Sequence, residues 1–200
     1  MRLSAETVAH LPPEVEPYGY VRESQGIGIV HFGIGAFHRA HQAWYTDLAM
    51  AAGERDWAIC GVSLRSARVA HQLSPQDGLY TLTERSGDDA RTRLIGAVRE
   101  VLFAPEQREA VIARIAASEC RIVSLTITEK GHVRGKGGAL DQEAAALSFY
   151  PILAEALEQR MAGGLAGLTL LPCDNLADHG AVLRRLMGEW LARDTPELAD

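Results

Sequence analysis

The fold is decided by the stretch Gly26-Ile27-Gly28-Ile29-Val30-His31-Phe32-Gly33-Ile34-Gly35-Ala36-Phe37-His38-Arg39. Residues 26–32 form an apolar run, broken only by Gly28 and His31, which is typical of a strand buried inside a sheet. The glycine pair at 33 and 35 follows at once, where the missing side chains let the backbone turn sharply. From residue 37 to residue 52 apolar side chains recur at helical spacing. The stretch therefore predicts a strand, a tight turn and a helix.

The same alternation continues along the rest of the chain. Further short apolar runs lie at residues 57–62, 121–127 and 168–171. Helical patterns lie between and after them, at about residues 66–73, 105–116, 148–163 (with Ser148 as N-cap) and 181–192. Strands that alternate with helices form a parallel sheet covered by helices on both faces. The predicted fold class is therefore α/β, with a doubly wound, mainly parallel sheet.

Two segments depart from this alternation. Strand-like runs at residues 79–84 and 92–98, joined by a polar turn, predict a β-hairpin inserted into the α/β pattern. Residues 1–25 are rich in proline and glutamate and lack the apolar core of a secretion signal. They are predicted to be an irregular arm that precedes a single domain, residues 26–200.

Composition limits the classes of partner. The chain is 47% hydrophobic and 23% charged with a net charge of −6, and its acids and bases are interspersed, which argues against a nucleic-acid partner. No apolar run approaches the roughly 20 residues that cross a bilayer. Cys60, Cys120 and Cys173 lie in or beside apolar runs, as reduced, buried cysteines of a cytoplasmic protein do. No zinc-type spacing of cysteine and histidine is present, so no metal site is predicted.

The candidate site follows from the fold. Ligands of a doubly wound sheet bind beyond the carboxyl ends of the strands. There, Gly33 and Gly35 would let a pyrophosphate approach backbone amides at a helix N-terminus, and Arg39 could meet the phosphates. The third position of the dinucleotide fingerprint is His38 instead of glycine. A tight turn that binds no cofactor, with Arg39 in solvent, is the alternative.

The end of the second strand bears on the choice of cofactor. An NAD enzyme usually presents an acid there to the adenosine ribose hydroxyls, but this chain has Ser63, Leu64 and Arg65. Arg65 could accept the 2′-phosphate of NADP, stack on adenine or face water. Both NAD and NADP therefore remain candidate cofactors.

Four separated blocks resemble one known family. They are IVHFGIGAFHRAHQ at residues 29–42, QDGLYTL at 76–82, IVSLTITEKG at 122–131 and PCDNL at 172–176. Together they are similar to the mannitol dehydrogenase family of polyol-specific long-chain dehydrogenases, which includes mannitol 2-dehydrogenases and fructuronate reductases (D-mannonate oxidoreductases). In that family His38 is the expected residue.

The resemblance implies a Rossmann domain that binds NAD or NADP, followed in the family by a mostly helical substrate domain that is absent here. The family's catalytic lysine belongs to that second domain, so no general base is assigned. Asn175 would donate its side-chain amide to the reacting oxygen, and Glu129 would relay protons, with Lys130 in a supporting position. Asn175 could instead cap a helix or shape a turn, and Glu129 could form a surface ion pair. The implied cofactor-binding residues are Gly33, Ile34, Gly35, Ala36, Phe37, His38, Arg39, Ser63 and Arg65.

The predicted function is hydride transfer between a nicotinamide and the secondary alcohol or ketone of a sugar alcohol or sugar acid, such as mannitol and fructose or mannonate and fructuronate. Two alternatives belong to other classes. A methyltransferase that uses S-adenosylmethionine also places glycines after its first strand, but it predicts an acid after the second strand and none of the four blocks. A non-catalytic nucleotide-binding module, or a fragment of an enzyme, is the other.

Overall fold

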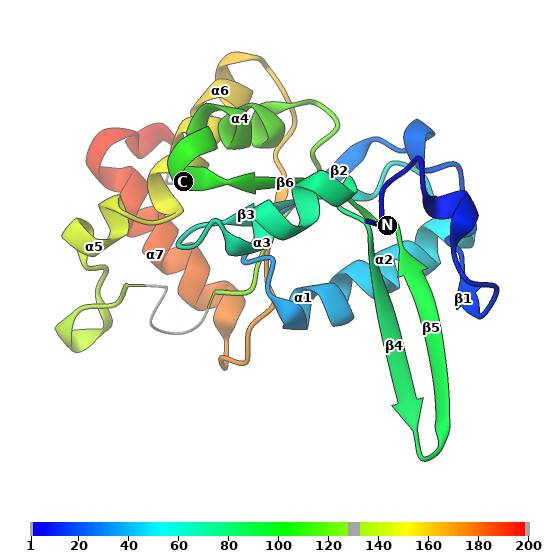
Figure 1. Ribbon diagram of the computed structural model, residues 1–200. Coiled ribbons are helices and arrows are strands. Elements are labelled where there is room, and N and C mark those ends of the chain that lie inside the picture. The colour runs from blue at the N-terminus through cyan, green and yellow to red at the C-terminus, as the bar shows by residue number, and fades with distance from the viewer. Residues whose placement is uncertain (1, 128–132, 199–200) are drawn as a thin grey trace.

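A five-stranded parallel sheet forms the centre of the computed structural model, which describes residues 2–127 and 133–198 (Figure 1). The strand order is β6-β3-β2-β7-β8, and every neighbouring pair is parallel. The first strand of this sheet, β2, is central. The next two strands, β3 and β6, extend the sheet to one edge, and β7 and β8 extend it to the other edge, which is the order of a doubly wound sheet. The strands are β2 (Ile27–Phe32), β3 (Ala58–Ser63), β6 (Val98–Phe103), β7 (Ile122–Leu125) and β8 (Thr169–Pro172).

Helices cover both faces of this sheet, as the alternating pattern predicts. Buried residues of α2 and α3 pack on one face, and buried residues of α4, α5, α6 and α7 pack on the other. The helices are α1 (Ala36–Ala40), α2 (Gln42–Ala51), α3 (Arg68–Leu73), α4 (Ala104–Ala116), α5 (Gln142–Ala146), α6 (Tyr150–Ala162) and α7 (His179–Asp194). Among the described residues, none of the helices combines the length and the apolar character needed to cross a membrane.

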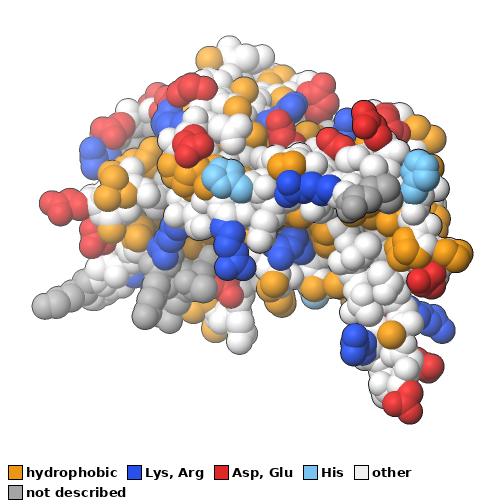
Figure 2. Space-filling model, in the orientation of Figure 1, with side chains coloured by type: hydrophobic (Ala, Val, Ile, Leu, Met, Phe, Trp, Pro, Cys, Tyr) orange, Lys and Arg blue, Asp and Glu red, His pale blue; other side chains and the backbone are white. Residues whose placement is uncertain are grey.

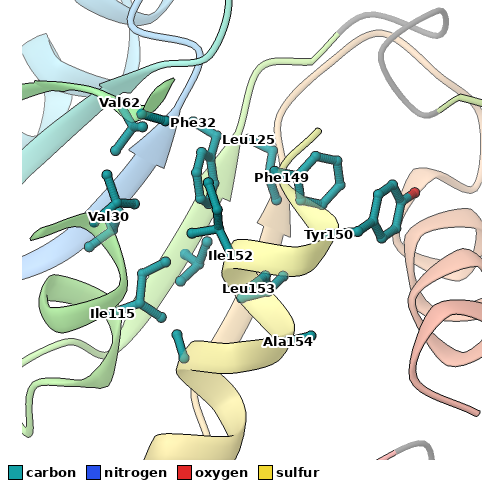
Figure 3. Packing of buried hydrophobic residues seen from close by; sticks show 14 of the residues in the cluster. Val30, Phe32, Val62, Ile115, Leu125, Phe149, Tyr150, Ile152, Leu153 and Ala154 are labelled. Carbon is teal, nitrogen blue, oxygen red and sulfur yellow. The ribbon is translucent and has the colours of Figure 1, made fainter. Parts of the chain in front are cut away.

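Side chains of the central strand β2 point alternately into two hydrophobic cores, one on each face of the sheet. Val30 and Phe32 pack toward α4 and α6, whereas Ile29 packs toward α2 and α3. Phe32 has no exposed surface, and its ring lies 5.9 Å from that of Phe149 at the start of α6 (Figure 3). Because both faces are buried, the strand reads in the sequence as a nearly continuous apolar run.

The predicted hairpin is present, but one strand beside it was missed. β4 (Tyr80–Ser86) and β5 (Asp89–Ile95) pair antiparallel, and β1 (Val15–Glu16) of the N-terminal arm adds a third strand to them. The hairpin projects from the body and carries charged side chains toward its tip (Figures 1 and 2). The prediction of one strand over 92–98 was wrong, because β5 ends at Ile95 and β6 starts at Val98 in the main sheet. The polar Arg99 and Glu100 hide this edge strand in the sequence.

Three local predictions also need correction. The helix expected over residues 37–52 is broken at His41, whose φ of −124° and ψ of −87° are not helical. Ser148 does not cap α6; its hydroxyl donates to the Ala145 carbonyl, and Phe149 is the N-cap residue. Of the cysteines, Cys173 is only half-buried, because it follows the end of an edge strand. Short 3-10 turns complete the described chain at Val8–His10, Arg22–Ser24, Ser74–Gln76, Lys136–Gly138 and Pro196–Leu198.

Candidate functional site

The turn after β2 requires glycine at its first position. Gly33 has a φ of +101°, and a Cβ there would lie 2.6 Å from the carbonyl oxygen of Thr126. The Gly35 amide donates to the Gly33 carbonyl at 2.6 Å, which closes the turn, and α1 starts at the next residue. A Cβ on Gly35 would meet no atom nearer than 3.8 Å, so this side of the turn is open to an approaching group.

A cleft of about 620 Å³ lies against this turn. It forms where the carboxyl ends of β2, β3 and β7 meet, which is the position expected for a ligand of a doubly wound sheet. None of the described residues that line the cleft carries a carboxylate, and Arg65 among them is cationic. The lining residues are Gly33, Ile34, Gly35, Ser63, Leu64, Arg65, Ser66, Val69, Thr126, Ile127, Val133, Ala144, Leu147 and Ser148.

Five of the predicted cofactor-binding residues therefore share one cleft. Gly33, Ile34 and Gly35 come from the turn, and Ser63 and Arg65 come from the end of β3. Ser63 is almost fully buried, whereas the Arg65 side chain is exposed at the wall. Strands β2 and β3 are neighbours in the sheet, and this pairing brings together segments about 30 residues apart in the sequence.

The remaining predicted residues of the turn lie outside the cleft lining. Arg39 is half-buried, and its guanidinium donates to the Ile34 carbonyl at 2.9 Å, so it braces the turn. Phe37 is 59% exposed and stacks on His41 with ring centroids 5.3 Å apart. Ala36 is exposed in the first turn of α1, and His38 is completely buried behind the turn.

Asn175 lies just beyond the carboxyl end of β8, at the same edge of the sheet. It is exposed and does not line the cleft, and its backbone amide donates to the Asp174 carboxylate at 2.9 Å. The N-cap residue of α7 is Asp178, so Asn175 is not the cap of that helix. The alternative role, in which Asn175 shapes a turn, agrees with the hydrogen bond from the Leu176 amide to the Asp174 carbonyl. Glu129 and Lys130 lie outside the described residues.

The sequence reasoning missed several residues of the cleft. Thr126 and Ile127 follow β7 directly, and Val133 and Leu147 come from the segment that follows. The rule that ligands meet the carboxyl ends of parallel strands applies equally to β7, so it could have found Thr126. No comparable signal marks Leu147, which is 92% exposed and belongs to no strand end.

Two buried histidines lie behind the turn and are neutral. Burial lowers the pKa of His31 from 6.5 to about 3, and burial also lowers the pKa of His38, with a smaller contribution from the adjacent His31. Their rings stack with centroids 3.6 Å apart. The interior at this point therefore tolerates neutral imidazoles and disfavours imidazolium.

Acid should destabilise the fold through these two histidines. Their folded pKa values lie below 6.5, so the unfolded chain takes up protons first as the pH falls. For His31 the stability that neutral burial provides is complete above about pH 6.5 and is lost toward pH 3, by about 1.4 kcal/mol per pH unit, and His38 adds a loss in the same direction. We expect the melting temperature of the wild type to fall more steeply between pH 6.5 and 4.5 than that of His31→Gln, which lacks one titrating ring. Equal slopes would contradict a neutral, buried His31.

Comparison with known proteins identifies the family of this domain. The sequence model of the mannitol dehydrogenase Rossmann domain matches residues 27–199. The chain belongs to this family. Mannitol 2-dehydrogenase of Aspergillus clavatus is 38% identical over 205 residues, which cover 94% of this chain and 40% of that protein. An uncharacterized oxidoreductase of Escherichia coli is 39% identical over 203 residues, which cover 94% of this chain and 42% of that protein.

A solved structure of the family has the same fold. The ternary complex of Pseudomonas fluorescens mannitol 2-dehydrogenase with NAD and D-mannitol superimposes with a TM-score of 0.92 at 39% identity. The match covers all of this chain and 44% of that one, so this mannitol dehydrogenase Rossmann domain spans less than half the length of its relatives. The predicted family and the α/β Rossmann fold are confirmed, and the methyltransferase alternative, which predicted no such match, is wrong.

Proposed function

We propose that this chain is the dinucleotide-binding domain of an NAD(P)-dependent oxidoreductase that acts on a sugar alcohol or sugar acid. The observation that carries the proposal is the cleft of about 620 Å³ at the turn that contains Gly33 and Gly35, in a domain of the mannitol dehydrogenase family. The turn fits a pyrophosphate because Gly35 leaves its outer side open. Among the described residues of the cleft wall, Arg65 is cationic and none is acidic, which favours an anionic ligand.

The residues have distinct proposed tasks. The amides of the turn would hold the pyrophosphate, while Ser63 and Arg65 would face the adenosine ribose. A bound nicotinamide supplies or accepts the hydride. The side-chain amide of Asn175 would donate to the oxygen of the reacting carbon, and its hydrogen bond strengthens as that oxygen gains negative charge. Glu129 is proposed to relay the proton, and its position lies outside the described residues.

The substrate and the compartment are also proposals. The Pseudomonas relative binds D-mannitol, and a polyol or a sugar acid such as mannonate is the proposed substrate class here. Cys60, Cys120 and Cys173 are free, which agrees with a reducing compartment, and we propose the cytoplasm.

The first test is binding. We expect NADH and NADPH to bind the purified chain saturably in a fluorescence titration, and a chain that binds neither would contradict the proposal. The same chain should show no turnover of mannitol or mannonate, because the resemblance places the catalytic lysine in the second domain. Turnover above a blank would show that a general base lies within these 200 residues.

Arg65 should govern the choice between the two cofactors. Its exposed guanidinium at the cleft wall can form charge-assisted hydrogen bonds with a 2′-phosphate, worth roughly 1.5–3 kcal/mol. We expect NADPH to bind at least as tightly as NADH, and Arg65→Asp to reverse that order. Arg68→Asp, on exposed α3 surface outside the cleft lining, is the matched charge control. A tenfold preference of the wild type for NADH would contradict this role.

A further inference from the structure

His31 lies in the middle of the sheet and has polar partners on two sides. It belongs to the central strand β2, has no exposed surface, and pairs in register with Ser124 of β7. Its Nδ1 lies 2.8 Å from the Ser124 hydroxyl, and its Nε2 lies 2.9 Å from the Thr126 hydroxyl. A buried polar side chain in a parallel sheet needs such partners, because an unpaired one is costly. The proposed function assigns no task to this ring.

The hydrogen-bond chain ends on the glycine turn. The Thr126 hydroxyl donates to the Gly33 carbonyl at 2.7 Å, and the same carbonyl accepts from the Gly35 amide and lies 3.3 Å from His31 Nε2. A hydroxyl has only one proton to donate. Because Thr126 donates this proton to the Gly33 carbonyl, its oxygen must accept the hydrogen bond from His31 Nε2. The neutral imidazole then carries its proton on Nε2 and accepts at Nδ1 from Ser124. The Ser124 hydroxyl also lies 3.1 Å from the side-chain oxygen of Gln42, but its single proton cannot be donated to both Gln42 and His31 Nδ1. Exchanging the amide oxygen and nitrogen of Gln42 lets Gln42 donate to Ser124 and completes the chain.

The face of the His31 ring packs against a second histidine. His38 stacks on it with centroids 3.6 Å apart and an interplanar angle of 15°. Neither ring nitrogen of His38 has a hydrogen-bond partner within the described part of the chain, so packing is what His38 contributes. Arg39, which follows His38 in the chain, donates to the Ile34 carbonyl of the same turn. The turn is thus supported from behind by the buried rings of His31 and His38, while Thr126, which joins His31 to the turn, also lines the cleft.

We propose that His31 is a positioning residue for dinucleotide binding, which acts from Nε2 on the carbonyl of Gly33, both through Thr126 and directly. This inference rests on the proposed function, since it assumes that the turn binds a dinucleotide. A fixed Gly33 carbonyl fixes the peptide planes of the turn, and these planes set the direction of the amides that meet a pyrophosphate. Pre-organised donors bind without a reorganisation cost, so loosening the turn weakens binding.

Three variants test the hydrogen bonds of the two ring nitrogens of His31 separately. His31→Gln places an amide near the position of Nε2 and keeps the contact with Thr126, whereas His31→Asn places one near Nδ1 and keeps only the contact with Ser124. His31→Phe keeps a ring beside His38 and removes both hydrogen bonds. We expect NADH to bind about tenfold more weakly to the Phe and Asn variants, and within about threefold of the wild type to the Gln variant.

Hydrogen exchange at one amide reports on the turn itself. The Gly35 amide is bonded to the Gly33 carbonyl, so its protection should fall in the Phe and Asn variants and be retained in the Gln variant. If His31→Phe does not fold, Thr126→Val and Thr126→Ser repeat the comparison, because serine keeps the hydroxyl and valine does not. Tenfold weaker binding to the valine variant alone would support the proposal.

The outcomes separate this inference from the proposed function. A wild-type chain that binds neither NADH nor NADPH overturns the proposed function and the positioning role together. A wild type that binds, with His31→Phe equal to it in affinity and only lower in melting temperature, overturns the positioning role alone. Equal losses in the Gln and Phe variants would also overturn it, because they would show that the hydrogen bonds made at the Nε2 position do not determine affinity.

Discussion

Replacing Gly35 with aspartate is expected to abolish dinucleotide binding while leaving the domain folded. The φ of Gly35 is −78°, and a Cβ there would meet no atom nearer than 3.8 Å, so the new side chain fits the free protein. Its carboxylate would lie where the pyrophosphate is proposed to bind and would repel it. We expect NADH affinity to fall at least 100-fold, which corresponds to about 2.7 kcal/mol, in a fluorescence titration.

Two matched variants locate the cause of that loss. Gly35→Asn has the same shape without the charge, so it should bind NADH more tightly than Gly35→Asp if repulsion contributes. Gly33→Ala should instead unfold more easily, because its φ is +101° and its Cβ would lie 2.6 Å from the Thr126 carbonyl. Unchanged affinity in a folded Gly35→Asp chain would remove the dinucleotide from this turn.

Replacing Asn175 with alanine should slow the chemistry far more than it weakens binding. The test needs a full-length context, in which this domain is joined to the substrate domain of a mannitol 2-dehydrogenase. By analogy with other donors to a developing oxyanion, we expect kcat to fall about 10²–10³-fold, with cofactor affinity nearly unchanged. Steady-state kinetics and an NADH titration of the same variant measure the two quantities.

The alternative role of Asn175 in the turn predicts the opposite result. A residue that only shapes the turn after β8 would lower the melting temperature and leave turnover largely intact. Asp174→Ala is the stability control, because the Asp174 carboxylate accepts from the Asn175 amide and holds that turn. A fully active Asn175→Ala enzyme with a lowered melting temperature would take the oxyanion role away from Asn175.

The central part of the fold could be predicted because its signals are local. A strand buried on both faces must be apolar along its length, and a turn with positive φ must contain glycine, so β2 and Gly33 are visible in the sequence. The edge strand β6 is not visible, because half of its residues are only partly buried and Arg99 and Glu100 interrupt its apolar pattern. The break at His41 is equally hidden, since apolar residues keep their spacing across it.

The sequence by itself determined the doubly wound sheet, the family and the residues of the turn, because periodicity and contiguous motifs are properties of neighbouring positions. The tertiary structure alone decided which of those residues share a cleft. Ser63 and Thr126 meet the turn through the pairing of β2 with β3 and β7, whereas Arg39 lies outside the cleft lining. The partnership of His31 with Ser124 and Thr126 joins residues more than 90 positions apart, and only strand register brings such residues within hydrogen-bonding distance.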